Sequence, residues 1–220
     1  GERRAELHTE HSVTRFCIGF PTCRMGARDD YALDLLAHDL GNSKNSRLYK
    51  RLVLALELVT DISVINETRQ DPGGLFVLGE LRQGVDPARV EQAIREEIAR
   101  QIQEGVSAAD LKRIRTQISA SFLFQDESAL DQAMKIARFE SGTPDGYRTL
   151  EDVLPTYESF TGRELRQVAA RYLDFKHAAV VWALPRETGA ASKPRPSRKK
   201  AKNKKAKNKK AKKAKGRAKR

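Results

Sequence analysis

The sequence has no apolar side chain large enough to build a core after Pro185. Beyond that residue, proline aside, nothing apolar is larger than alanine, and the string Ala-Lys-Asn-Lys-Lys recurs. Such a segment cannot bury enough surface to offset the entropy that ordering costs. We therefore expect a folded part that ends at residue 185 and a disordered Lys/Arg-rich tail over residues 186–220. A chain of 220 residues is long enough for one domain of this size.

The net charge of +13 comes from the tail alone. Residues 193–220 contain 17 Lys or Arg and no acid, and removing them from the total of 42 leaves 25 basic against 29 acidic residues. The rest of the chain is therefore mildly acidic, and polyanion binding is expected of the tail only. The lysines expected to bind polyanions are Lys199, Lys200, Lys204, Lys205, Lys209, Lys210, Lys212 and Lys213.

The tail has no aromatic residue among its lysines, so stacking of bases is not expected. Its binding would be unspecific and would weaken as salt rises, through counterion release. Nucleic acid and anionic membrane surfaces would fit equally well, and a solvated extension without a dedicated partner is the open alternative. No stretch approaches the ~18 consecutive apolar residues of a membrane span, so the chain is not expected to be transmembrane.

Strand patterns follow a polar lead-in over residues 1–11. Residues 13–20 alternate between two faces, which predicts the first strand. Residues 59–66 and 74–81 are rich in β-branched and apolar side chains, and the turn chemistry between them predicts an antiparallel hairpin. Residues 178–184 form the last predicted strand.

Apolar residues at helical spacing, with capping residues before them and glycine stops after them, predict the helices. These helices are expected over residues 30–40, 48–56, 87–104, 107–122, 129–139 and 161–172. The order is strand, two helices, two strands, several helices and a strand. It indicates an α+β domain over residues 12–185, with a mainly antiparallel sheet and helices packed on one face.

Several strings follow one another in the folded part. They are Asp30-Tyr31-Ala32-Leu33, Asn45-Ser46-Arg47-Leu48-Tyr49-Lys50-Arg51-Leu52, residues 74–81, Gly105-Val106-Ser107-Ala108-Ala109-Asp110-Leu111 and Arg171-Tyr172-Leu173. In this order they resemble the C-terminal, non-zinc domain of the pitrilysin/insulinase family of zinc metallopeptidases. The resemblance spans residues 12–185 and is carried by the order, since no single string is specific.

The resemblance implies two homologous halves that close around an extended peptide, with zinc in the N-terminal half. There, a helix carries His-x-x-Glu-His, whose imidazoles hold the metal while the Glu activates the bound water. This chain lacks that motif. The nearest string, His8-Thr9-Glu10-His11, is one residue too short, and His38 and His177 lie far from any matching pair. No metal-binding residue is expected here, and zinc is expected in the partner half.

The resemblance also implies two functional positions. In active members of the family, an Arg and a Tyr seven residues apart contact the substrate and the developing oxyanion. Aligned from Leu48, these positions are Val53 and Thr60. Valine cannot donate a charge-assisted hydrogen bond, and threonine cannot reach as far as a tyrosine hydroxyl. Arg51 and Tyr49 lie close in sequence but are expected to point elsewhere. No catalytic residue is therefore expected in this chain, and the chain alone is expected to be inactive.

Three functions remain open at this point. The first is an accessory half of a zinc peptidase, which packs against a zinc-bearing half, in the same precursor or on another chain, and aligns a peptide substrate by strand addition. The second is an inactive structural or assembly protein of the same fold. The third is a polyanion-binding module that acts through its tail. Proteins that resemble this chain are commonly bacterial and exported or periplasmic, but no residue here indicates a compartment.

Overall fold

A computed structural model describes residues 1–124 and 128–186 of the chain. The folded unit runs from Gly1 to Arg186. The predicted disorder of the tail and its polyanion-binding lysines concern residues that lie outside the described ones. The last strand of the folded unit ends at Pro185.

The sheet has the strand order β1-β5-β2-β4-β3. The bounds are Arg3–Thr9 for β1, Arg15–Pro21 for β2, Val59–Glu67 for β3, Gly74–Leu81 for β4 and Ala179–Pro185 for β5. The β1–β5 pair is parallel, and the pairs β5–β2, β2–β4 and β4–β3 are antiparallel. The predicted hairpin and the mainly antiparallel sheet are therefore confirmed.

Helices fill the rest of the unit. The α-helices are α1 Arg28–Gly41, α2 Pro87–Glu104, α3 Ala108–Phe124, α4 Ala129–Gly142, α5 Val153–Ser159 and α6 Gly162–Tyr172. Shorter turns are η1 Tyr49–Ala55, which is π-helical, and the 3₁₀ segments η2 Gly146–Asp152 and η3 Phe175–His177. The predicted helices are all present, whereas α5, η2 and η3 were not predicted.

Strand β1 corrects the prediction that residues 1–11 are only a polar lead-in. It runs parallel to β5, from Arg3 opposite Ala179 to Thr9 opposite Pro185. Its side chains are mostly exposed, so it lacks the alternation of buried and exposed residues by which a strand is recognised in a sequence. Backbone pairing at the edge of the sheet holds it, together with the ion pair between Arg4 and Glu91 of α2.

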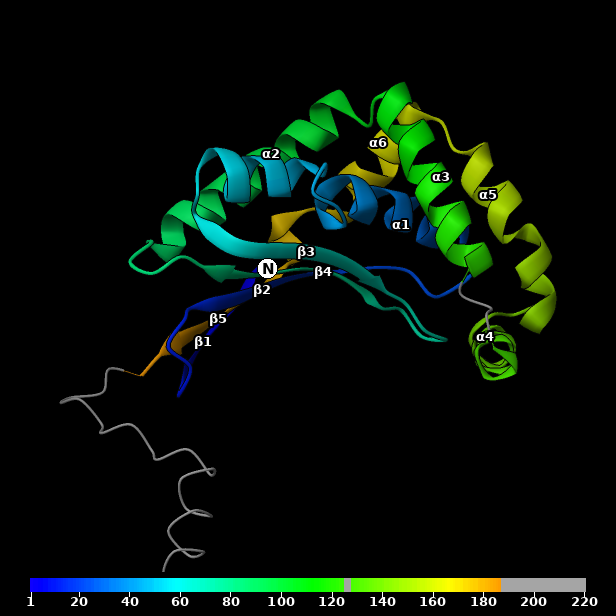
Figure 1. Ribbon diagram of the computed structural model, residues 1–220, viewed down its shortest axis with the longest axis horizontal. Coiled ribbons are helices and arrows are strands. Elements are labelled where there is room, and N and C mark those ends of the chain that lie inside the picture. Colours follow the sequence, from blue (N-terminus) through cyan, green and yellow to red (C-terminus); the bar gives the residue numbers. More distant parts are fainter. Residues whose placement is uncertain (125–127, 187–220) are drawn as a thin grey trace, which may run out of the picture. The chain divides into compact units, whose positions relative to one another are not determined.

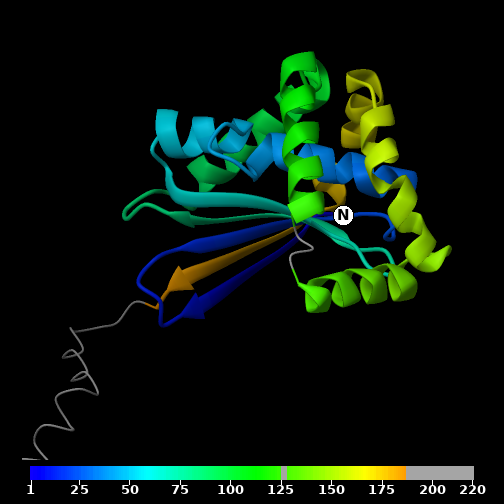
Figure 2. The same ribbon diagram turned by 45° about the vertical axis from the view of Figure 1, so that its right-hand side comes forward.

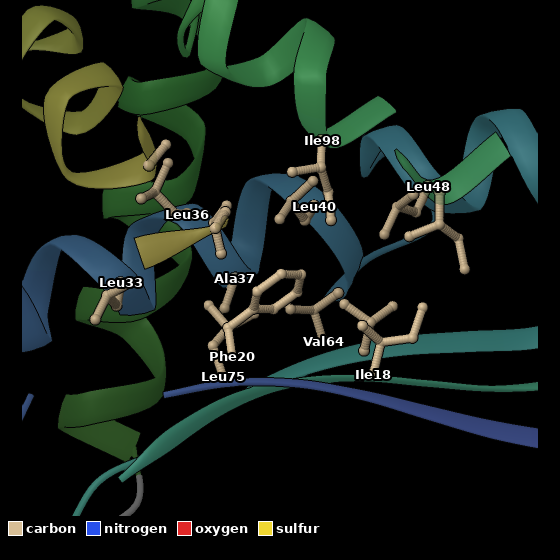
Figure 3. Packing of buried hydrophobic residues seen from close by; sticks show 14 of the residues in the cluster. Ile18, Phe20, Leu33, Leu36, Ala37, Leu40, Leu48, Val64, Leu75 and Ile98 are labelled. Carbon is tan, nitrogen blue, oxygen red and sulfur yellow. The ribbon is translucent and has the colours of Figure 1, made fainter. Parts of the chain in front are cut away.

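The core lies between the sheet and α1, which is buried nearly all round its circumference. Gly41 lets the end of this helix approach β3, since a Cβ there would stand 2.3 Å from the Cγ2 of Val64. Figure 3 shows side chains of α1 above those of the strands and beside Ile98 of α2. The labelled core residues are Ile18, Phe20, Leu33, Leu36, Ala37, Leu40, Leu48, Val64, Leu75 and Ile98.

The helices α1, α2, α3 and α6 lie on one side of the sheet (Figure 1), and the view turned by 45° shows the same layering (Figure 2). Burial alternates along the central strand β2, where Phe16, Ile18 and Phe20 are buried and the residues between them are not. The expectation that helices cover one face is confirmed. The other face of the sheet is therefore left uncovered by these four helices.

Candidate functional site

The open face is the side of the sheet that points away from α1 and α2. Its side chains form three rows across the strands β5, β2, β4 and β3. The rows are Ala179, Gly19, Phe76 and Ile65; then Val181, Cys17, Leu78 and Ser63; then Ala183, Arg15, Glu80 and Asp61. Two rows are apolar or small, and the third is charged.

Small residues in these rows make the open face shallowly concave. A hollow of about 450 Å³ lies over the second and third rows. At Gly19 the ring of Phe76 lies where a side chain would stand, 3.0 Å from the position of an added Cβ. The charged row contains a salt bridge of 2.6 Å between Arg15 and Glu80. The open face can therefore contact an apolar surface or an extended chain, with charged groups at one end.

Both cysteines, Cys17 and Cys23, are free, and both are partly exposed. Cys17 lies in the second row of the open face, and burial raises the pKa of its thiol. Burial, followed by the charges of Asp30 and Asp29, raises the pKa of Cys23 to about 11. Because the thiolate is the reactive form, neither cysteine is set up as a nucleophile.

The two ends of the strand order, β1 and β3, are the edges of the sheet. Their outer backbone groups pair with no other strand among the described residues. Strand β3 has a register shift between Val59 and Asp61, so a bulge interrupts its first residues. Its second half includes Ile65, whose side chain is 42% exposed. Such an edge can accept an extended peptide by backbone hydrogen bonds.

Val53 and Thr60, which we aligned with the family's Arg and Tyr positions, do not meet at a site. Val53 lies in η1 and is buried in the core. Thr60 is exposed on β3, where its hydroxyl donates a 3.3 Å hydrogen bond to the carbonyl of Glu80. A buried valine and an engaged threonine leave no donor aimed at a substrate.

Neighbouring residues do not replace that pair. The guanidinium of Arg51 bonds to Glu96 and lies 3.5 Å from Glu97, both on α2. Tyr49 is partly buried against the core. Both side chains are therefore held on the helix side of the domain.

The histidines take separate places. His8 is on β1 and is exposed, and His11 follows the strand, so the i, i+3 spacing of a helix does not apply to them. His38 is partly buried on α1, where burial and then the charge of Arg113 lower its pKa. His177 lies 3.5 Å from Asp174 in η3. Among residues 1–124 and 128–186, no group of three or more His, Cys, Asp or Glu is placed to hold a metal ion.

A pocket on the helix side was missed by the sequence analysis. It has a volume of about 580 Å³ and lies between α1, α3, α4 and α5. Two carboxylates one helical turn apart, Asp30 and Asp34, reach it from α1. The i, i+4 spacing of these acids on α1 was the available signal, but it did not indicate which helices would enclose them.

The sequence matches the model of the family described as the Peptidase M16 inactive domain, over residues 1–118. The match includes β1, β2, β3 and β4 and ends within α3, so β5 lies outside it. The chain belongs to the Peptidase M16 inactive domain family. No curated protein matches the sequence.

Solved structures share the fold at low sequence identity. A protease from Helicobacter pylori is 22% identical with a TM-score of 0.78, over 84% of this chain and 44% of that one. A peptidase M16 inactive domain from Pseudomonas fluorescens is 16% identical with a TM-score of 0.71, over 88% and 45%. An inactive peptidase domain from Bordetella parapertussis is 17% identical with a TM-score of 0.72, over 84% and 99%. The chain thus spans less than half the length of the first two.

Membership of an inactive-domain family agrees with the prediction that this chain does not hold the catalytic zinc. It also agrees with the accessory, non-catalytic character expected from the resemblance. Within the described residues, no helix is both long and apolar enough to cross a bilayer.

Proposed function

We propose that this chain is the accessory half of a zinc metallopeptidase and that its open face forms one wall of the peptide chamber. A homologous zinc-bearing half would supply the opposite wall and all of the proteolytic chemistry. The observation that carries the proposal is an uncovered, largely apolar sheet face on a domain of the inactive M16 family. Such a face is usually covered by a second layer of structure.

Two further observations support this proposal. The chain spans 44% of the Helicobacter pylori protease and 45% of the Pseudomonas fluorescens protein, which leaves room for a second half in each of those relatives. The residues aligned with the family's Arg and Tyr are a buried valine and a threonine bonded to the backbone. The proposed role is therefore to bind and align the peptide, with β3 as the edge to which an extended chain adds.

The first experiment compares the intact native polypeptide with this 220-residue chain. Bound zinc is measured by metal analysis, and cleavage of an unstructured reporter peptide is measured in parallel. Zinc and cleavage in the intact protein, with neither in this chain, support the accessory half. Absence of zinc and of cleavage in the intact protein, both alone and after a separate zinc-bearing half is added, contradicts the accessory half and favours an assembly protein of the same fold.

A second experiment locates the contact surface. Val181→Glu places a charge in the middle row of the open face, and Leu130→Glu places the same charge on α4, where Leu130 is 70% exposed. Association with the zinc-bearing half is measured by analytical ultracentrifugation. We expect Val181→Glu to weaken association by at least about tenfold, while Leu130→Glu leaves it unchanged. Equal effects of the two substitutions would contradict the assignment of the open face.

We infer a separate activity for the tail, because residues 193–220 hold 17 cations and no acid. The candidate contacts are the paired lysines, such as Lys199-Lys200 and Lys209-Lys210. Binding to a DNA or RNA duplex of arbitrary sequence should fall steeply as salt rises and should not depend on the sequence. A truncation after Arg186 should abolish it. Retention of the duplex by the truncated chain would overturn this proposal and would leave the accessory-half proposal unaffected.

A further inference from the structure

Strand β3 is an edge strand with a long regular stretch. It comes last in the strand order, and its register with β4 is continuous from Asp61 to Glu67, because the shift lies before Asp61. Alternate residues of this stretch therefore lie on the same face of the sheet. Ile62 and Val64 are buried on the helix side. The side chains on the open face are those of Asp61, Ser63, Ile65 and Glu67.

These four side chains differ in what they offer to a neighbouring strand. The Ile65 side chain is 42% exposed, and Ser63 is small and neutral. Asp61 is exposed and forms no ion pair with any residue that the structure describes, whereas Glu67 lies 3.1 Å from Arg69. The edge therefore has one apolar position and one unpaired acid, with a small residue between them.

The adjacent strand explains why Ile65 stays exposed. Phe76 of β4 is opposite Ile65, but its ring lies over two glycines. An added Cβ would stand 3.0 Å from this ring at Gly19 of β2 and 2.7 Å from it at Gly74 of β4. The ring therefore leans away from β3 and gives Ile65 little cover. An apolar side chain on an added strand would supply that cover, since cross-strand apolar pairs stabilise a sheet.

Asp61 has no cation available within its own row of the sheet. The row runs from Arg15 on β2 through Glu80 on β4 to Asp61 on β3. Arg15 is joined to Glu80 at 2.6 Å, which leaves the negative charge of Asp61 uncompensated at the edge. A cationic side chain opposite Asp61 on an added strand would form an opposite-charge pair, and a carboxylate there would be repelled. The charge of this edge thus favours a strand that carries a cation.

We propose that the edge of β3 selects peptides in which an apolar residue is followed, four positions later, by a lysine or an arginine. Antiparallel addition places these two side chains opposite Ile65 and Asp61, because the added chain runs from Glu67 towards Asp61. Antiparallel pairing is the arrangement that β3 already has with β4, and it is slightly more stable than parallel pairing. This substrate class rests on the accessory-half proposal, which assigns the edge of β3 to the peptide.

The test is an NMR titration of the full 220-residue chain with four short peptides. The first is acetyl-Thr-Leu-Thr-Ser-Thr-Arg-Thr-amide. The second replaces Arg by citrulline, the third replaces Leu by Ser, and the fourth exchanges the positions of Leu and Arg. We expect the first peptide to bind at residues 59–67, the second and third to bind about threefold more weakly, and the fourth to bind more weakly than either. The first and fourth peptides have the same charge, so the cationic tail affects both equally.

Variants of the chain test each contact separately. Asp61→Lys should reverse the preference, so that a peptide with Glu in place of Arg binds about threefold more tightly than the first peptide. Ile65→Thr keeps a β-branched side chain that suits a strand, and it should make the first and third peptides bind equally. Glu6→Lys makes the same charge change on an exposed residue of β1 and should leave every preference unchanged.

Three results of these titrations would overturn the proposal. They are a failure of all the peptides to saturate residues 59–67, equal binding of the first and fourth peptides, and equal effects of Asp61→Lys and Glu6→Lys. Self-association of the chain through β3, seen as shifts of the same resonances with protein concentration, would overturn it as well. Zinc and cleavage in the intact polypeptide decide the accessory-half proposal separately, so the substrate class can fail while the accessory half stands.

Discussion

Side chains of the same kind are buried on one side of the sheet and at least partly exposed on the other. On the helix side, apolar residues such as Val180 are fully buried, and charged residues such as Asp39 are enclosed with a partner, Arg47. On the open face, the neighbouring Val181 is only partly buried, and the Arg15–Glu80 pair is exposed. The helix side therefore determines stability, and the open face is left free for contacts with other molecules.

The largest expected difference between the sides concerns their ion pairs. The Nε of Arg47 lies 2.9 Å from Asp39, which is 2% exposed, and its NH2 donates at 2.7 Å to the carbonyl of Gly105. Arg47→Leu leaves that carboxylate buried without a charged partner, with only the amide of Gln101 donating to it at 3.0 Å, and should cost about 3–5 kcal/mol in the free energy of unfolding. Urea denaturation at pH 7 measures the loss.

The matched control is Arg15→Leu on the open face. The salt bridge to Glu80 is 2.6 Å long, but the two side chains are 47% and 36% exposed. Solvent screens such a pair, so its loss should cost less than about 1 kcal/mol. Similar losses for the two arginine variants would show that burial does not distinguish the two sides.

A second test uses adjacent residues of β5. Val180 is fully buried and Val181 is partly exposed on the other face. Val180→Ala should lower the free energy of unfolding by about 2–3 kcal/mol, because it removes buried methyl groups and leaves a cavity. Val181→Ala should lower it by less than about 1 kcal/mol. Thermal or urea unfolding of the two variants measures the difference, and a reversed order would contradict the assignment of the faces.

The smallest expected effect concerns pH and the helix side alone. The pKa of Asp34 rises from 3.8 to about 7 in the folded chain, so the folded state holds a proton that the unfolded state has lost. Stability from this group is therefore greatest at low pH and falls as pH rises towards 7. Asp34→Asn should remove that fall and stabilise the chain at pH 8 by an amount on the order of 2 kcal/mol.

Urea unfolding of both proteins at pH 5 and pH 8 measures this effect. His38 acts with the opposite sign in the same window, because its pKa is lowered and stability from it grows as pH rises. That contribution is common to the native chain and to Asp34→Asn, so the difference between them isolates the carboxyl group. If the native chain and Asp34→Asn differ by the same free energy of unfolding at pH 5 and at pH 8, the raised pKa of Asp34 is refuted.

Much of the fold was predictable from the sequence because its core elements are strongly patterned. The alternation in β2, the hairpin of β3 and β4, and the capped helices α2 and α6 follow rules that act over a few residues. Strand β1 was not predictable, because its exposed side chains carry no pattern and its pairing partner lies far along the chain. Helix α5 was missed because it is only seven residues long and no glycine marks its C-terminal end.

The candidate sites were less predictable than the fold. The absence of the zinc motif could be read directly, and the positions of Val53 and Thr60 followed from the resemblance. The pocket over Asp30 and Asp34 could not be predicted, because Asn66 and Tyr157 converge on it from β3 and α5. A cavity depends on contacts between elements, whereas sequence patterns report mainly on each element by itself.

The position of β5 has a consequence for the order in which the chain can fold as it is made. This last strand lies between β1 and β2, and β1 has no other partner in the sheet. While residues 179–185 are still inside the ribosome, the nascent chain therefore has two unpaired strand edges, on β1 and on β2. Unpaired edges invite association with other chains. The nascent chain thus stays vulnerable to misassembly until its final strand emerges.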